Sequence, residues 1–232
     1  MKTIIILMLL LIQSSFVFAS EEIHLEKAPI DLSDQPSLQK GAKTFINYCL
    51  NCHSAKYMRY NKLLDIGLSK KDIKENLLFT GKKIGDPMEI SMPVKESKKW
   101  FGATPPDLSV VARSRGSDWI YSYMKGFYRD SSREIGWNNV VYVNSAMPHI
   151  LWELQGEQEL DKNTGELSLI KAGKLNQKEY DSVIVDLTNF ITYMSEPGQL
   201  KRKKMGFYVV GFLLLLLVLT IKLKKEFWKD IK

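Results

Sequence analysis

The sequence predicts a mainly α-helical exported domain that one C-terminal helix holds to a membrane. Three observations indicate this fold class: an apolar N-terminal leader, several stretches with apolar residues at helical spacing, and an almost wholly apolar run near the C-terminus. The chain has 232 residues, which leaves roughly one globular domain between the two apolar ends. We expect a signal peptide at 1–19, an exported domain at 20–204, a transmembrane helix at 205–223 and a cytoplasmic tail at 224–232.

The N-terminal leader has the order of a secretory signal peptide: a basic residue, an apolar run and small residues. Lys2 comes first, the run begins at Ile4, and Ala19 and Ser20 close the segment. An uncleaved N-terminal anchor is the alternative, but Gln13 interrupts a run that is already short. We expect cleavage after Ala19 or Ser20.

Apolar spacing then predicts the helices of the domain in order. Ser37 is a plausible N-cap, and Leu38, Ala42 and Phe45 recur at helical spacing up to Cys49. The same spacing predicts helices over 65–79, which Gly81 would end, over 108–124 in one or two pieces broken around Gly116, and over 179–194.

Three segments between these helices lack helical spacing. Residues 82–106 are rich in Gly, Pro and Lys and predict a long irregular loop, which in a compact domain is usually functional or disordered. Residues 129–148 are irregular, with a β-branched and aromatic run at 140–143 that suits a short strand. Residues 157–173 have the composition of a surface turn or hairpin.

Residues 205–221 are almost wholly apolar and span about 26 Å as a helix, slightly less than the roughly 30 Å hydrocarbon core. Lysines on both sides can reach the interfaces, and two such basic clusters would be hard to bury in a soluble domain. The net charge of +7 is therefore explained by the lysines that flank the membrane span. No nucleic-acid partner is expected. The signal peptide sets the orientation, with the domain outside and the tail in the cytoplasm.

The chain has two cysteines, in the run Cys49-Leu50-Asn51-Cys52-His53. This is the Cys-x-x-Cys-His pattern of haem attachment. Two thiols about one helical turn apart can form thioethers to one edge of a porphyrin, and the adjacent histidine then lies under the iron. A thioredoxin-like pair would want a strand before it, and a zinc site lacks its other two ligands. The sequence therefore predicts one covalent haem c.

The sixth iron ligand is less determined. A methionine ligand raises the reduction potential and suits electron transfer. Met58 is too close to His53, and Met124 and Met194 lie on the apolar faces of expected helices. Two Met-Pro pairs in loops remain, Met92-Pro93 and Met147-Pro148, and the β-branched run before Met147 favours it over Met92. His149 is a further candidate.

Taken together, the chain resembles the cytochrome c1 family, the haem subunit of the quinol:cytochrome c oxidoreductase or cytochrome bc1 complex. Beyond the haem motif, the resemblance lies in Gly102-Ala103-Thr104-Pro105-Pro106-Asp107-Leu108-Ser109, in Ala146-Met147-Pro148, and in Ser195-Glu196-Pro197 followed by Lys201-Arg202-Lys203-Lys204 and the membrane span. It covers almost the whole mature chain.

The resemblance implies a cytochrome c-like haem domain with long loop insertions, with Cys49 and Cys52 joined to haem c and His53 and Met147 as axial ligands. It also implies that Pro105 and Pro106 line the histidine side of the haem and that Arg115 meets a haem propionate.

Some residues depart from the family pattern. Trp100-Phe101 stand in place of two asparagines, Gly116-Ser117 in place of Gly-Gly, Trp119 in place of a tyrosine, and Tyr142-Val143-Asn144-Ser145 in place of Phe-Pro-Gly-Gly.

The implied function is a one-electron relay from an iron-sulfur partner to a cytochrome c. The implied partners are the cytochrome b and Rieske subunits in a dimeric complex of the inner membrane, with the haem domain on the periplasmic side. A stand-alone membrane-anchored shuttle is the rival, although Glu196-Pro197-Gly198 leaves little room for a flexible tether. The acidic region of Glu153, Glu157, Glu159 and Asp161 either guides a basic cytochrome c or is an ordinary surface loop.

Overall fold

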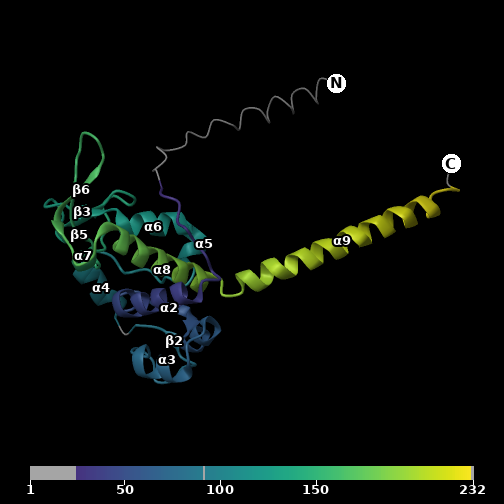
Figure 1. Ribbon diagram of the computed structural model, residues 1–232, viewed down its shortest axis with the longest axis horizontal. Coiled ribbons are helices and arrows are strands. Elements are labelled where there is room, and N and C mark those ends of the chain that lie inside the picture. The colour runs from purple at the N-terminus through teal and green to yellow at the C-terminus, as the bar shows by residue number, and fades with distance from the viewer. Residues whose placement is uncertain (1–24, 91, 231–232) are drawn as a thin grey trace.

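The computed structural model of the chain describes residues 25–90 and 92–230. It consists of a helical domain from which one long helix extends to one side (Figure 1). The expected signal peptide at 1–19 lies outside the described residues. In chain order, the elements are α2 (Gln35–Thr44), η2 (Phe45–Cys49), β1 (Ala55–Arg59), η3 (Tyr60–Ile66), α3 (Lys70–Asn76), β2 (Pro87–Met88), α4 (Val94–Phe101), α5 (Val111–Arg115), α6 (Ser117–Lys125), β3 (Phe127–Arg129), β4 (Trp137–Asn139), α7 (Trp152–Gln155), β5 (Gly156–Leu160), β6 (Leu167–Ala172), α8 (Gln177–Ser195) and α9 (Gln199–Phe227).

The core of the domain is the contact between α2 and α8. The helices approach so closely at Gly41 that a methyl group there would lie 1.9 Å from the carbonyl oxygen of Asp186 and 2.7 Å from Cβ of Phe190. The rings of Phe45 and Phe190 pack 5.6 Å apart between centroids. Glycine is therefore required at position 41 by the space available to it.

The first helix begins earlier than the sequence suggests. Asp34, not Ser37, is the N-cap, and its carboxylate accepts a hydrogen bond from the Ser37 amide at 3.0 Å. Ser37 is buried, and its hydroxyl accepts from Asn189 Nδ2 at 2.8 Å. The expected continuation of the helix to Cys49 is confirmed, with its last turn widened into the π-helix η2.

Two expectations for the segment after the cysteines are wrong. The helix expected over 65–79 is the shorter α3, which ends at Asn76 and is preceded by the 3₁₀-helix η3. Ser69 and Asp72 form a capping box that starts α3 at Lys70. The loop expected over 82–106 contains the helix α4, which ends at Gly102 with a φ of 73°.

Within the described residues, three antiparallel two-stranded sheets complete the domain: β1 with β2, across η3 and α3, β3 with β4, and β5 with β6. The hairpin expected within 157–173 is confirmed as β5 and β6. The strand expected at 140–143 is wrong, because the strand β4 ends at Asn139. The side-chain oxygen of buried Asn139 accepts from the amides of Val141 and Tyr142 at 2.8 and 3.2 Å, which turns the chain out of the sheet.

The helices expected around Gly116 and over 179–194 are confirmed as the pair α5 and α6 and as α8. Gly116 lies between α5 and α6, and its φ of 91° interrupts the helical backbone there.

Three residues separate the end of α8 from the start of α9, and no residue of α9 is buried. It is longer at both ends than the expected span of 205–223, and its 29 residues give about 43 Å, enough to cross a hydrocarbon core of about 30 Å. Within the described chain it is the one helix long and apolar enough for this. The Arg202 guanidinium pairs with Glu196 across the junction and lowers the pKa of that carboxyl.

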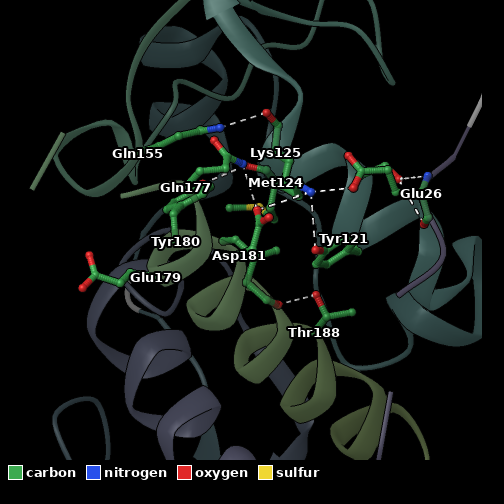
Figure 2. Close-up of polar contacts among 12 residues, drawn as sticks. Glu26, Tyr121, Met124, Lys125, Gln155, Gln177, Glu179, Tyr180, Asp181 and Thr188 are labelled. Atoms are coloured by element: carbon green, nitrogen blue, oxygen red, sulfur yellow. Dashed lines mark hydrogen bonds and ion pairs between the residues drawn. The ribbon is translucent and has the colours of Figure 1, made fainter. Parts of the chain in front are cut away.

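The described chain begins with an extended segment that lies across α6. The Glu26 amide donates to Ser122 Oγ at 2.8 Å, and the Lys125 ammonium lies between the carboxylates of Glu26 at 2.5 Å and Asp181 at 3.3 Å (Figure 2). Burial alone would lower the pKa of Lys125, but the two carboxylates outweigh it and hold the pKa above its ordinary value of 10.5. A charged Lys125 therefore joins the N-terminal segment, α6 and α8.

Candidate haem-binding site

The Cys-x-x-Cys-His run forms a single tight turn after η2. Cys49 is the last residue of η2, and its carbonyl oxygen accepts from the amides of Cys52 at 3.1 Å and His53 at 2.8 Å. The turn therefore begins at a fixed helix end, and the two thiols and the imidazole belong to one short segment of defined backbone.

The two thiols have the properties of structural rather than redox-active cysteines. Cys49 is 7% exposed and Cys52 is half-buried. Burial raises the pKa of the Cys49 thiol to about 12 and raises that of Cys52 as well. A redox-active pair needs a lowered thiol pKa, and here a helix rather than a strand precedes it. Residues 25–90 and 92–230 contain no cluster of three or more ligands that suits a metal such as zinc.

The imidazole of His53 is oriented by a backbone carbonyl. Its Nδ1 atom lies 2.8 Å from the carbonyl oxygen of Pro106. Because a carbonyl can only accept, Nδ1 carries the proton and Nε2 keeps its lone pair, which is the form that binds iron. Burial lowers the pKa of His53, which further favours the neutral ring. These residues fit a haem c iron on the Nε2 side.

Two residues that the sequence did not single out hold Pro106 in place. The Ser54 carbonyl accepts from the Leu108 amide at 2.8 Å. The Asp107 carboxylate accepts from the Lys56 amide at 3.0 Å and from the Ser109 amide at 2.8 Å. Asp107 stands directly after the two prolines. Its place in the Pro-Pro-Asp run is the sequence feature that could have identified it as a residue that holds Pro106. Pro105 is half-buried beside this segment.

Met147 lies in a loop fixed by a different set of contacts. Its side chain is half-buried against the core, and its amide donates to Ser145 Oγ at 3.2 Å. The Ser145 hydroxyl is in turn 2.7 Å from the Tyr123 hydroxyl. Burial raises the pKa of Tyr123 to about 12, so the phenol stays protonated and can hold Ser145. Tyr123 and Ser145 were not found from the sequence.

Arg115 belongs to the same group of contacts as Met147. Its guanidinium carbon lies 5.2 Å from the ring centroid of Trp119 and 5.9 Å from that of Tyr142. The Trp119 ring stacks on Tyr123 at 4.8 Å with an interplanar angle of 8°. Trp119, which departs from the family pattern, thus links Arg115 to the tyrosine that holds the Met147 loop.

The structure also places the other candidate ligands. His149 is buried, with its ring stacked 4.8 Å from Phe127 and edge-on to Trp137 at 5.1 Å. Burial lowers the pKa of His149 to about 4, as expected for a neutral core histidine. Met92 is half-buried and precedes α4 in a segment for which the sequence predicted only a loop.

The contacts therefore gather the seven predicted residues into two groups. One comprises Cys49, Cys52, His53, Pro105 and Pro106; the other comprises Arg115 and Met147. Hydrogen bonds between segments far apart in the sequence hold the first group, and aromatic contacts with a hydrogen bond between Tyr123 and Ser145 hold the second.

Two of the four carboxylates of the acidic region are paired with basic neighbours. Glu157 pairs with Arg129 at 2.7 Å and Lys171 at 2.9 Å, and Glu153 pairs with Lys174 at 2.6 Å. Arg129 first, and then Lys171, lower the pKa of Glu157 to about 2. This favours the interpretation of the region as an ordinary surface loop.

Comparison with known proteins agrees with the family resemblance. The model of the cytochrome C1 family matches residues 25–231. The chain is 48% identical to the ammonia monooxygenase gamma subunit of Nitrosomonas europaea over 100% of both chains. It is 45% identical to cytochrome c1 of Allochromatium vinosum over 99% of both chains. A chain of a hyperthermophilic respiratory complex III is similar with a TM-score of 0.45 and 16% identity, covering 100% of this chain and 98% of that one. The chain therefore belongs to the cytochrome c1 family and is a membrane-anchored electron-transfer cytochrome with covalent haem c.

Proposed function

We propose that Cys49 and Cys52 carry the haem through thioether bonds and that His53 and Met147 are its axial ligands. The observation that carries this assignment is the hydrogen bond between His53 Nδ1 and the Pro106 carbonyl, because it leaves Nε2 free for iron. Bound haem c supplies a one-electron redox change. The chain orients the imidazole through the Pro106 carbonyl and mounts Met147 in a half-buried loop.

In this proposal Pro105 and Pro106 line the histidine side of the haem, and Arg115 binds a propionate. Arg115 is exposed and held between two aromatic rings, so its planar guanidinium is pre-positioned for a carboxylate.

The chain would relay single electrons from an iron-sulfur partner to a soluble electron carrier, with a cytochrome c as the expected acceptor. It would serve as the electron-transfer subunit of a quinol:cytochrome c oxidoreductase, beside cytochrome b and the Rieske protein in a dimeric complex. Helix α9 would cross the inner membrane once, with residues 20–204 as the periplasmic haem domain and 224–232 as the cytoplasmic tail. The apolar length of α9 and the basic residues at both its ends support the single crossing, and the orientation follows from the expected signal peptide at 1–19.

Purification of the full chain from membranes in mild detergent tests the proposal. Co-elution with a b-type cytochrome and an iron-sulfur protein, together with quinol-dependent reduction of the haem, is the expected result. Elution as a lone haem protein would support the stand-alone shuttle instead. Co-elution with a monooxygenase, which the name of the Nitrosomonas relative suggests for that protein, would also contradict the proposal.

A further inference from the structure

Met147 lies midway between two buried residues, Ser145 and His149. Ser145 is 2% exposed and His149 is 1% exposed, whereas Met147 itself is half-buried. No helix or strand of the described chain includes the segment 140–151. The position of Met147 therefore depends on the contacts that hold the residues two before it and two after it.

Ser145 is held by Tyr123, a residue of α6. The two hydroxyl oxygens lie 2.7 Å apart in the core, and Ser145 Oγ also accepts from the Met147 amide at 3.2 Å. Both contacts meet on one oxygen atom, so a single atom connects the Tyr123 hydroxyl to the Met147 backbone. The Tyr123 ring is fixed in turn, because Trp119 stacks on it at 4.8 Å and Phe127 packs edge-on at 5.0 Å.

His149 is held by the same part of the chain. Its ring stacks on Phe127 at 4.8 Å with an interplanar angle of 5° and meets Trp137 edge-on at 5.1 Å. Phe127 is also the ring that packs against Tyr123. One short segment, 123–127, therefore contacts the chain on both sides of Met147, with a hydrogen bond on the side of Ser145 and ring packing on the side of His149.

The backbone directly before Ser145 is strained. Asn144 has a φ of 63° and is the one described non-glycine residue with a positive φ. Its amide donates to Asn138 Oδ1 at 2.8 Å, and its carbonyl accepts from Arg133 Nη2 at 3.2 Å. A left-handed residue with a side chain costs energy and persists only where its surroundings enforce it. Loss of the Ser145 contact would remove a restraint next to this residue, and the chain before Met147 could then relax.

We propose that Tyr123 is a positioning residue for the axial ligand and that it acts through Ser145 on the backbone of Met147. This inference rests on the proposed function, in which Met147 is that ligand. Met147 would bind the iron as part of the same chain, so its occupancy depends on the effective concentration that the chain gives its sulfur. Tyr123 raises this effective concentration because it limits where the Met147 backbone can go.

The test uses the variant Tyr123→Phe, which keeps the ring and removes the hydroxyl. The oxidised, haem-loaded full chain in detergent is titrated with imidazole, which must displace the axial methionine to bind the iron. We expect imidazole to bind the variant about fivefold more tightly, the factor that a hydrogen bond of ordinary net strength contributes. The reduction potential should fall, because the methionine that raises it is held less firmly.

Ser145→Ala tests the same connection from its other end. It removes the oxygen atom that both contacts share, so imidazole should bind this variant at least as tightly as Tyr123→Phe. The double variant should bind imidazole no more tightly than Ser145→Ala, because Tyr123 acts through Ser145. Additive effects of the two substitutions would contradict this route.

Tyr60→Phe is a matched control. The Tyr60 hydroxyl also contacts a hydroxyl, Thr80 Oγ1 at 2.9 Å, and Tyr60 is fully buried. The control should lose about as much stability in denaturant unfolding as Tyr123→Phe and should bind imidazole like the unmodified protein. If Tyr60→Phe tightens imidazole binding equally, or if Tyr123→Phe loses stability with no change in imidazole binding, Tyr123 has only a structural role and the inference is overturned.

Met147→Ala separates this inference from the function on which it rests. If imidazole binds Met147→Ala no more tightly than the unmodified protein, Met147 is not the ligand and the proposed assignment is wrong. If imidazole binds Met147→Ala far more tightly but binds Tyr123→Phe like the unmodified protein, only the positioning role of Tyr123 is wrong.

Discussion

The Nδ1 atom of His53 lies 2.8 Å from the carbonyl oxygen of Pro106, a residue 53 positions further along the chain. The bond fixes the ring's tautomer and its rotation together. It depends on a backbone segment rather than on another side chain, so substitution of Pro106 alone would not remove the acceptor. The residue that can be changed is Asp107, which holds this segment against Lys56 and Ser109.

We expect Asp107→Ala to loosen the orientation of His53. The variant loses two hydrogen bonds to backbone amides, which should cost about 1 kcal/mol of unfolding free energy. A weaker carbonyl contact makes the imidazole a poorer donor to iron, so the reduction potential should rise. Potentiometry and denaturant unfolding measure the two effects. Asp72→Ala, which removes the capping box of α3, should cost similar stability with no change in potential.

Met147→Ala should abolish the weak long-wavelength absorption band of the oxidised protein that reports iron–methionine bonding. The reduction potential should fall, because a methionine ligand raises it, and the haem should stay covalently attached. Met92→Ala is the control and should keep the band. If Met147→Ala keeps the band and Met92→Ala loses it, the axial ligand has been assigned to the wrong loop.

Gly41→Ala should destabilise the domain by about 3 kcal/mol, near the upper end for an overpacked core. Alanine normally favours a helix over glycine, but here its methyl group would lie 1.9 Å from the Asp186 carbonyl oxygen. Thermal unfolding of the haem-loaded full chain in detergent measures the change. Gly85→Ala, at a site with no atom within 4 Å of the added methyl, should be nearly neutral.

Glu157→Gln should destabilise the protein at neutral pH but not in strong acid. The pKa of Glu157 is lowered from 4.5 to about 2 in the folded protein. A lowered carboxyl pKa contributes stability above pH 4.5, and that contribution is lost as the pH falls to about 2. The difference in unfolding midpoint between the two proteins should therefore narrow across this range. The control is Glu159→Gln on the same strand, which removes a carboxylate that takes part in no ion pair found among the described residues and should cost less stability at neutral pH.

The sequence was sufficient to predict an element where its local pattern and its tertiary contacts favour the same structure. Helix α8 has helical spacing and a capping box at Asn176 and Glu179, and its presence follows from the chain alone. The haem motif is equally local, because its geometry comes from one turn after a helix.

The sequence failed where contacts between distant segments decide the structure. Helix α4 was missed because its lysine-rich composition resembles a loop, and bonds from Ile90 and Leu108 to Ser54 hold it in place. The strand expected at 140–143 has strand-forming side chains, but Asn139 takes up the backbone amides that a strand would use. Tyr123 and Ser145 were missed because no pattern links residues 22 positions apart.

The short link between α8 and α9 limits where the haem domain can go. Residues 196–198 reach about 10 Å even when fully extended, and the pairing of Glu196 with Arg202 takes up part of that length. The haem domain can therefore move only a short distance relative to α9. Electron transfer over a longer distance than this requires a molecule other than this chain. Turnover would then depend on how often mobile partners reach a haem that is held close to the membrane.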